Sequence, residues 1–135
     1  MKILAYGDIM EGGTSVFTTI LKIKEKELIV SFKGVIRVDD PYKYLSYFIK
    51  DIETKIDIED IGSTIIDFTE LKYTNSNGFY VLMDIIENIY KNTKGPITVK
   101  RLKEDDWQQE TLPILLNCDD KKISTRIKLE DEYNL

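Results

Sequence analysis

The chain has 135 residues, 42% of them hydrophobic and 32% charged, which is the composition of one ordinary globular domain. Its 19 Lys and Arg residues stand against 24 Asp and Glu residues, so the net charge is −5 at pH 7. This acidic balance argues against nucleic acids and anionic membranes as partners, because both attract basic proteins. The absence of histidine excludes imidazole bases, Ser-His-Asp triads and the common zinc sites.

Cysteine content and hydropathy bear on the compartment. Cys118 is the single cysteine, so an internal disulfide cannot form, and this usage favours the cytoplasm. The uninterrupted apolar runs are too short to cross a bilayer, and the N-terminus lacks the long apolar centre of a secretory signal. We therefore expect a cytoplasmic protein without membrane insertion.

The first part of the chain predicts a lead segment and a hairpin. We expect one domain over residues 1–135, because no linker or repeat divides the chain, and we interpret residues 1–13 as a flexible N-terminal lead. Residues 15–23 and 27–32 are apolar, β-branched runs, and a short charged turn joins them. This pattern predicts a β-hairpin.

A helix and a strand are predicted next. The pair Asp40-Pro41 predicts a helix start, since Asp is a good N-cap acceptor and Pro suits the first helical position. Apolar residues then recur at helical spacing from Leu45 to Ile56. Residues 63–68 form a short, continuous β-branched run, which is typical of a strand buried on both faces.

The second half of the chain continues this alternation. Helical spacing returns from Phe79 to Tyr90, and a Gly-Pro pair precedes a predicted strand over 97–102. We expect a short helix to start near Thr111, with Pro113 in its first turn, and a last strand over 122–129. The order β-β-α-β-α-β-α-β predicts an α/β domain in which helices cover at least one face of a mixed sheet.

A small polar segment, residues 74–78, separates the strand at 63–68 from the second helix. Its Asn-Gly pair is common in hairpin turns, but the residues that follow have helical spacing. We therefore expect a strand-to-helix connection with Ser76 as the N-cap of the helix, and the residues alone favour that capping role. The same position also suits a regulatory phosphate, which would lie beside free N–H groups at the positive end of the helix dipole.

The stretch around this segment, "IIDFTELKYTNSNGFYVLMDII", resembles the signature of STAS domains, which are named after sulfate transporters and anti-sigma-factor antagonists. In that signature an aspartate at the end of a buried strand precedes an Asp-Ser-Ser-Gly box and an apolar helix. Asp67 matches the aspartate, and Leu71 and Tyr73 match the apolar positions between the two. Residues 75–78 match the box, with asparagine in place of its aspartate and of its second serine.

The resemblance extends beyond this stretch. The predicted order of elements over residues 15–129 is similar to that of the family. The later stretch "WQQETLPILL" is similar to a subgroup of small, stand-alone bacterial STAS-like proteins. Most of the chain is therefore covered by the resemblance.

The resemblance implies a signalling adaptor without catalytic activity. In the antagonist branch, a serine/threonine kinase of the anti-sigma-factor type phosphorylates the box serine, and a PP2C-type phosphatase removes the phosphate. The unmodified form binds its partner and the modified form releases it, which is called partner switching. Ser76 would be the phosphoacceptor, with Thr74 as the second choice, and this chain would carry no catalytic residue, metal or cofactor. The expected partner-binding residues are Tyr73, Asn75, Ser76, Asn77, Gly78, Tyr80 and Asp84.

Several alternatives stay open at this point. Asn75 in place of aspartate either eases the accumulation of phosphate charge or removes a carboxylate that a kinase recognises. The chain could instead be a constitutive STAS subunit of a larger transport or sensor assembly, with Ser76 only a helix cap. A small nucleotide-binding protein is a third alternative. The sequence does not indicate the oligomeric state.

Overall fold

The computed structural model describes residues 1–56 and 59–133, which form a sheet with helices packed against it. The strands are β1 (Lys2–Glu11), β2 (Thr14–Lys24), β3 (Glu27–Ile36), β4 (Ser63–Thr74), β5 (Ile97–Leu102) and β6 (Ile127–Glu132). The helices are α1 (Tyr42–Lys55), α2 (Ser76–Asn92), α3 (Asp106–Leu115) and α4 (Lys121–Ser124). None of the helices in the described ranges is long and apolar enough to cross a membrane.

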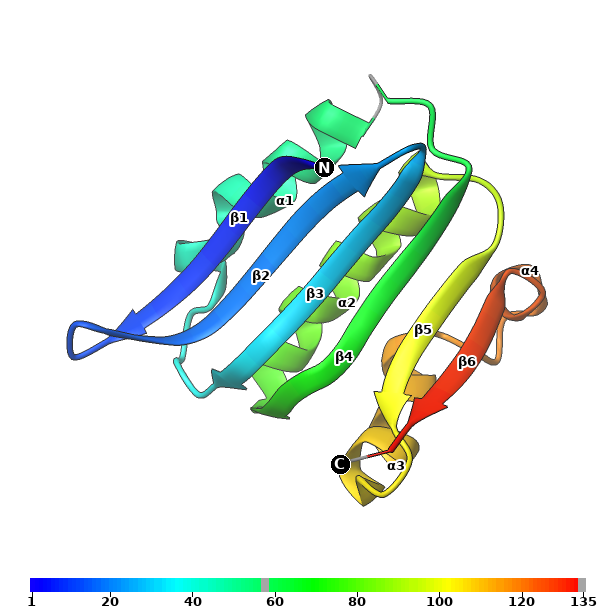
Figure 1. Ribbon diagram of the computed structural model, residues 1–135. Helices are drawn as coiled ribbons and strands as arrows, with labels where there is room; N and C mark the ends of the chain where they lie inside the picture. The colour runs from blue at the N-terminus through cyan, green and yellow to red at the C-terminus, as the bar shows by residue number, and fades with distance from the viewer. Residues whose placement is uncertain (57–58, 134–135) are drawn as a thin grey trace.

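The six strands follow one another across the sheet in the order in which they occur in the sequence. β1, β2 and β3 pair antiparallel, whereas β3, β4, β5 and β6 pair parallel. α1 and α2 lie behind the sheet in Figure 1 and leave its front face uncovered. The predicted α/β domain with a mixed sheet is therefore confirmed, and it has one strand more at its N-terminus than expected.

That additional strand is β1, so the prediction of a flexible lead over residues 1–13 is wrong. The glycines that interrupt the local pattern have structural roles. A Cβ at Gly7 would lie 2.9 Å from Cδ2 of Leu45, so this glycine allows α1 to approach the strand. Gly12 and Gly13 have φ values of 56° and 79° and form the turn to β2. β1 is held by antiparallel pairing with β2 across this turn and by packing against α1.

The predicted hairpin is present as β2 and β3, joined at Glu25 and Lys26, which have φ values of 48° and 71°. The predicted start of α1 needs a small correction. The helix begins at Tyr42, and within the described ranges the carboxylate of Asp40 makes no capping hydrogen bond. The carbonyl of Asp40 instead accepts from the backbone N–H of Lys43, at 3.3 Å.

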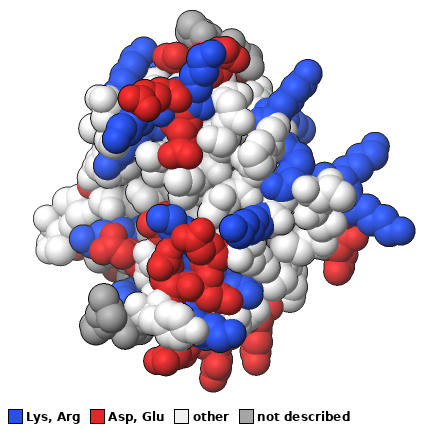
Figure 2. All heavy atoms as spheres, turned by 45° about the vertical axis from the view of Figure 1, so that its right-hand side comes forward, with Lys and Arg blue, Asp and Glu red and all other residues white. Residues whose placement is uncertain are grey.

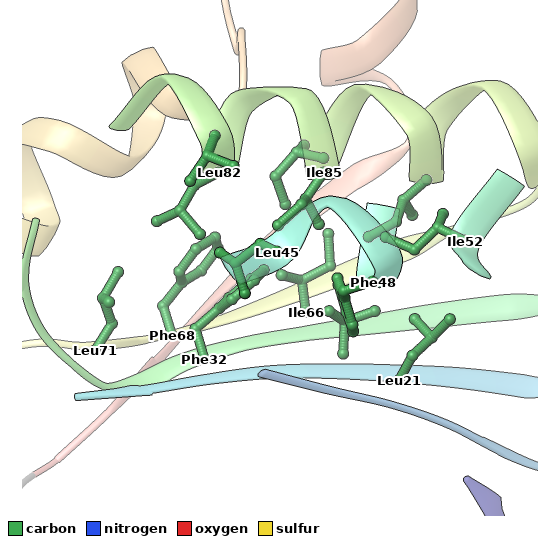
Figure 3. Packing of buried hydrophobic residues seen from close by; sticks show 14 of the residues in the cluster. Leu21, Phe32, Leu45, Phe48, Ile52, Ile66, Phe68, Leu71, Leu82 and Ile85 are labelled. Carbon is green, nitrogen blue, oxygen red and sulfur yellow. The ribbon is translucent and has the colours of Figure 1, made fainter. Parts of the chain in front are cut away.

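The hydrophobic core lies between the sheet and the pair α1 and α2 (Figure 3). Alternate residues along most of β2, β3 and β4 face this core, and Phe32 of β3 stacks on Phe68 of β4 with ring centroids 5.2 Å apart. β4 is not buried on both faces as predicted, because Ile65 and Asp67 on its other side are only half-buried. Burial of each large apolar side chain contributes about 1.5–3 kcal/mol, so the core holds β4 and α2 firmly against each other.

The C-terminal part differs from its prediction at two places. α3 begins at Asp106, after an N-cap at Asp105 whose side chain accepts from the N–H of Gln108 at 3.0 Å. Pro113 therefore lies near the end of the helix and not in its first turn. Residues 121–124 form α4 where the start of a strand was expected, and β6 begins only at Ile127, whereas β5 has its predicted bounds.

Candidate functional site

The polar segment predicted as a connection is very short in the structure. β4 continues to Thr74 and α2 begins at Ser76, so Asn75 alone separates the strand from the helix. Ile36, the last residue of β3, pairs with Thr74, and this register brings the ends of both strands to the start of α2 (Figure 1). We call this place the β4–α2 junction.

Asn75 is the N-cap of α2, so the prediction that Ser76 is the cap is wrong. The Asn75 side-chain oxygen accepts from the N–H of Gly78 at 2.8 Å, and its Nδ2 donates to the carbonyl of Val38 at 3.1 Å. A carboxylate could accept the first bond but could not donate the second. The carbonyl of Val38, which needs a donor, thus gives a structural reason for asparagine at the position where the STAS signature has aspartate.

Asn77 makes a similar contact on the other side of Ser76. Its Nδ2 donates to the carbonyl of Asp39 at 2.8 Å. The amides of Asn75 and Asn77 therefore both hold the loop between β3 and α1, residues 37–41, against the first turn of α2. Both were predicted as partner-binding residues, and in the structure each has a hydrogen bond within the chain.

Ser76 is exposed and is the first residue of α2, a helix of 17 residues. Within residues 1–56 and 59–133, no group forms a hydrogen bond with its hydroxyl. The backbone N–H groups of Ser76 and Asn77 also lack acceptors in these ranges, as expected for the first turn of a helix. No acidic residue lies in that turn, so its partial positive charge is uncompensated.

Two neighbouring positions are buried, in contrast to their predicted roles. Thr74 is 7% exposed and its hydroxyl donates to the carbonyl of Asn75 at 3.0 Å, so it does not lie in an accessible loop as expected. Gly78 is also buried. A Cβ there would lie 2.0 Å from Oγ1 of Thr74 and 2.7 Å from Cγ2 of Ile36. Gly78 therefore allows close packing of α2 on the sheet, and its part in partner binding stays a prediction.

The outward side of α2 carries Ser76, Tyr80 and Asp84, which lie one above another at helical spacing. Tyr80 is 59% exposed. Asp84 accepts a hydrogen bond from the hydroxyl of Tyr42 at the start of α1. Burial, together with that hydrogen bond and the charge of Asp84, raises the pKa of Tyr42 to about 12. Asp84 thus links α1 to α2, a contact that the sequence did not indicate.

An aromatic and cationic group lies at the end of β4. Tyr73 is 43% exposed, and the guanidinium carbon of Arg37 lies 5.8 Å from the centroid of its ring. The ring of Trp107 in α3 lies 6.5 Å from that of Tyr73, tilted by 39°. We call Arg37, Tyr73 and Trp107 the aromatic stack. Tyr73 was predicted from the sequence as a partner-binding residue but Arg37 was not, because only the pairing of β3 with β4 brings the two together.

Other surfaces of the described structure are weaker candidates for a functional site. In the described ranges, no group of Cys, Asp and Glu is arranged to hold a metal ion. A groove of about 380 Å³ lies between α2 and the C-terminal helices, but it contains none of the predicted site residues. On the face shown in Figure 2, acidic side chains lie among the basic ones. The β4–α2 junction is therefore the candidate site that the structure supports best.

Comparison with known proteins gives a result at the level of the fold. No family model matches the sequence, and the comparison with curated proteins gives no match. An anti-sigma factor antagonist from Mycobacterium paratuberculosis is similar with a TM-score of 0.50 and 19% identity, over 86% of each chain. The anti-sigma factor antagonist SpoIIAA in its unphosphorylated form is similar with a TM-score of 0.50 and 11% identity, over 84% of this chain and 89% of that one. The chain therefore has the STAS fold of the anti-sigma factor antagonists.

Proposed function

We propose that this protein is a non-catalytic regulator that binds a protein partner and is switched by reversible phosphorylation of Ser76. The observation that carries the proposal is the exposed hydroxyl of Ser76 at the start of α2, which has no hydrogen-bond partner among the described residues. Thr74 is buried, which leaves Ser76 as the accessible hydroxyl of the two proposed acceptors.

The local electrostatics suit a phosphate at this position. A phosphoryl group adds about −1.5 to −2 charges and three acceptor oxygens. The free N–H groups of Ser76 and Asn77 are suitable donors, and the helix dipole favours a negative charge there by about 0.3–1 kcal/mol. The fold would therefore tolerate the modified side chain without rearrangement of the core.

The modification itself requires only an acceptor from this chain. A serine/threonine kinase of the anti-sigma-factor type would transfer the γ-phosphoryl group of ATP to Oγ of Ser76. The bond from phosphorus to the leaving ADP oxygen breaks, the Oγ–P bond forms and the hydroxyl proton is released. A PP2C-type phosphatase would transfer the phosphoryl group to water and restore the hydroxyl. The structure of SpoIIAA in its unphosphorylated form agrees with such a cycle in a protein of the same fold.

The exposed aromatic side chains near Ser76 suit a protein partner. Tyr73 and Tyr80 are 43% and 59% exposed, and tyrosine combines apolar area with a polar tip, which protein interfaces favour. A partner that covers these rings would also cover Ser76. A phosphate there would become a buried anion unless the partner supplied a cation, and the partner would dissociate. We propose this release as the output of a bacterial partner-switching pathway.

The alternative in which Ser76 serves only as a helix cap does not agree with the contacts at the start of α2. Asn75 forms that cap, so the helix does not require the hydroxyl of Ser76. The main alternative function is that of a constitutive STAS subunit, and one measurable property distinguishes it from a regulator that is switched by phosphorylation. The affinity of such a subunit for the partner would not depend on the charge at position 76.

The test compares Ser76→Asp with Ser76→Asn, which have the same shape and differ in charge. The partner is first captured from native cells with the unmodified protein, and its affinity for both variants is then measured by calorimetry. We expect Ser76→Asn to bind within about threefold of the wild type and Ser76→Asp to bind at least about tenfold more weakly, which corresponds to about 1.4 kcal/mol. Equal affinities of the two variants would support the constitutive subunit and contradict the switch.

A further inference from the structure

We propose that Arg37 is the residue that binds the phosphate on Ser76, and that in doing so its side chain leaves the ring of Tyr73. This inference rests on the phosphorylation proposed above, and it specifies how the modification changes the surface around it. Phosphorylation would then act in two ways: it adds an anion at Ser76 and removes a cation from the aromatic stack.

The backbone fixes Arg37 beside the phosphorylation site. The carbonyls of its two neighbours both accept from Asn75: Ile36 from the backbone N–H at 2.9 Å, and Val38 from the side-chain amide at 3.1 Å. Arg37 therefore lies next to the residue that precedes Ser76. These hydrogen bonds position the backbone of the loop and leave the long side chain of Arg37 free to move.

The side chain of Arg37 has no competing anion. It is exposed, it forms no ion pair within residues 1–56 and 59–133, and its guanidinium carbon lies over the face of Tyr73, 5.8 Å from the ring centroid. A cation–π contact at an exposed site is weak. A phosphate can accept two parallel, charge-assisted hydrogen bonds from a guanidinium group, which is a stronger and more directional interaction. The phosphate should therefore displace Tyr73 as the partner of Arg37.

Other charged groups near the junction do not provide an equivalent. Lys43 lies over the ring of Tyr44, at 5.9 Å, on α1. Asp39 is in the same loop as Arg37, and its carboxylate would repel a phosphate. Lys72, in β4 next to Tyr73, is the remaining exposed cation close in sequence, and it serves as the competing candidate in the test.

The aromatic stack supplies a built-in reporter. Trp107 is the single tryptophan of the chain, and its ring centroid lies 6.5 Å from that of Tyr73. Departure of Arg37 from the ring of Tyr73 changes the electrostatic surroundings of Trp107, which packs against the same ring. Phosphorylation of Ser76 should therefore alter the fluorescence of Trp107, although no direct contact joins the two residues in the described structure.

The test uses the full chain with phosphoserine encoded at position 76, so that no kinase is needed. ³¹P NMR gives the pKa of the phosphate, which is about 6 for free phosphoserine. We expect a lower pKa in the otherwise unmodified chain, a rise of about half a unit in Arg37→Gln, and an intermediate value in Arg37→Lys. Phosphorylation should change the Trp107 emission of the parent chain and leave that of Arg37→Gln unchanged.

Two control variants make the result specific. Lys91→Gln removes the same charge in the last turn of α2, 15 residues from Ser76 and about 22 Å away along the helix, where screening by salt is nearly complete. It should leave the phosphate pKa unchanged, and so should Lys72→Gln. Circular dichroism verifies that each variant is folded.

The proposal is overturned if Arg37→Gln and the parent chain give the same phosphate pKa, or if Lys72→Gln gives the larger rise. Either result would leave the proposed function intact, because partner release is measured separately with Ser76→Asp and Ser76→Asn. Conversely, a phosphate pKa that depends on Arg37, together with equal affinities of those two variants, would support the phosphate site and contradict the switch.

Discussion

The polar groups at the two ends of α2 are satisfied in different ways. At the C-terminal end, Arg126 donates to the carbonyls of Tyr90 and Gly95 and to the hydroxyl of Thr93, at 3.0–3.2 Å. At the N-terminal end, the Asn75 side chain accepts from the N–H of Gly78, and the N–H groups of Ser76 and Asn77 have no acceptor among the described residues. The C-terminal end thus has a cation from a distant part of the chain, whereas no acidic residue lies in the first turn at the N-terminal end.

This difference concerns the charges that stabilise the two ends of α2. A cation at the C-terminus of a helix and an anion at its N-terminus both stabilise it. In this chain Arg126 supplies the cation at the C-terminus of α2, whereas no acidic residue lies in its first turn. The complementary charge at the N-terminal end is what we propose phosphorylation provides.

The largest effect is expected from Gly78→Ala, which disturbs the N-terminal end itself. The new Cβ would lie 2.0 Å from Oγ1 of Thr74 and 2.7 Å from Ile36, so the start of α2 must move away from the sheet. We expect a loss of about 3 kcal/mol in the free energy of unfolding, measured by urea denaturation. Gly62→Ala is the control, because its Cβ would have only ordinary contacts at 3.8 Å or more. Similar losses in both variants would contradict the close packing assigned to Gly78.

Arg126→Met should remove the charge and the hydrogen bonds from the C-terminal end. Two carbonyl groups and a hydroxyl group would lose their donor, and we expect a loss of about 2 kcal/mol in unfolding free energy. Partner binding should stay unchanged, because Ser76 lies at the opposite end of the helix. Lys128→Met, at an exposed position of β6, serves as the control and should be nearly neutral. A stable Arg126→Met variant would show that this end needs no internal cation.

Substitution of Asn75 should separate its two hydrogen bonds. Asn75→Ala removes both the cap and the bond to Val38, for an expected loss of about 1.5 kcal/mol. Asn75→Asp retains the cap and loses the bond to Val38, for an expected loss of about 0.5–1 kcal/mol. Thermal unfolding of both variants checks this order. If Asn75→Asp were the more stable protein, the amide would have no structural reason to replace the carboxylate.

The smallest effect on stability is expected at Ser76. Ser76→Ala should change the unfolding free energy by less than about 0.5 kcal/mol, because the hydroxyl has no partner among the described groups. Ser76→Asp should stabilise the protein by about 0.3–1 kcal/mol at low ionic strength through the helix dipole, and salt should reduce that gain. Urea denaturation at two salt concentrations measures both values. A loss of about 1 kcal/mol or more in Ser76→Ala would restore the capping role to this residue.

Local patterns predicted the elements whose stability is encoded locally. The β2–β3 hairpin, the apolar face of α2 and the bounds of β5 follow from side-chain periodicity and turn residues. β1 was missed because Gly7 interrupts its pattern, and because Gly12 and Gly13 were interpreted as the end of a flexible lead, although a Gly-Gly pair also suits the turn of a hairpin. α3 was predicted to start too late because Pro113 was interpreted as a first-turn residue, although Asp105 was available as a cap.

Only those features of the candidate site that depend on local sequence patterns could be predicted. Exposure of Ser76 at a helix start follows from the sequence, but Asn and Ser are both good caps, so propensity could not decide between Asn75 and Ser76. The contacts of the 37–41 loop depend on the parallel register of β3 and β4. For that reason neither the contact of Arg37 with Tyr73 nor the burial of Gly78 could be predicted before the strands were placed together.

The most direct test of the account is the phosphorylation state of the protein isolated from its native cells under several growth conditions. Intact mass measures the number of phosphoryl groups, and peptide mapping assigns their positions. The account predicts a single phosphate, on Ser76, in an amount that varies with conditions. A protein that carries no phosphate under any condition, or carries it at another residue while Ser76 stays unmodified, would contradict it.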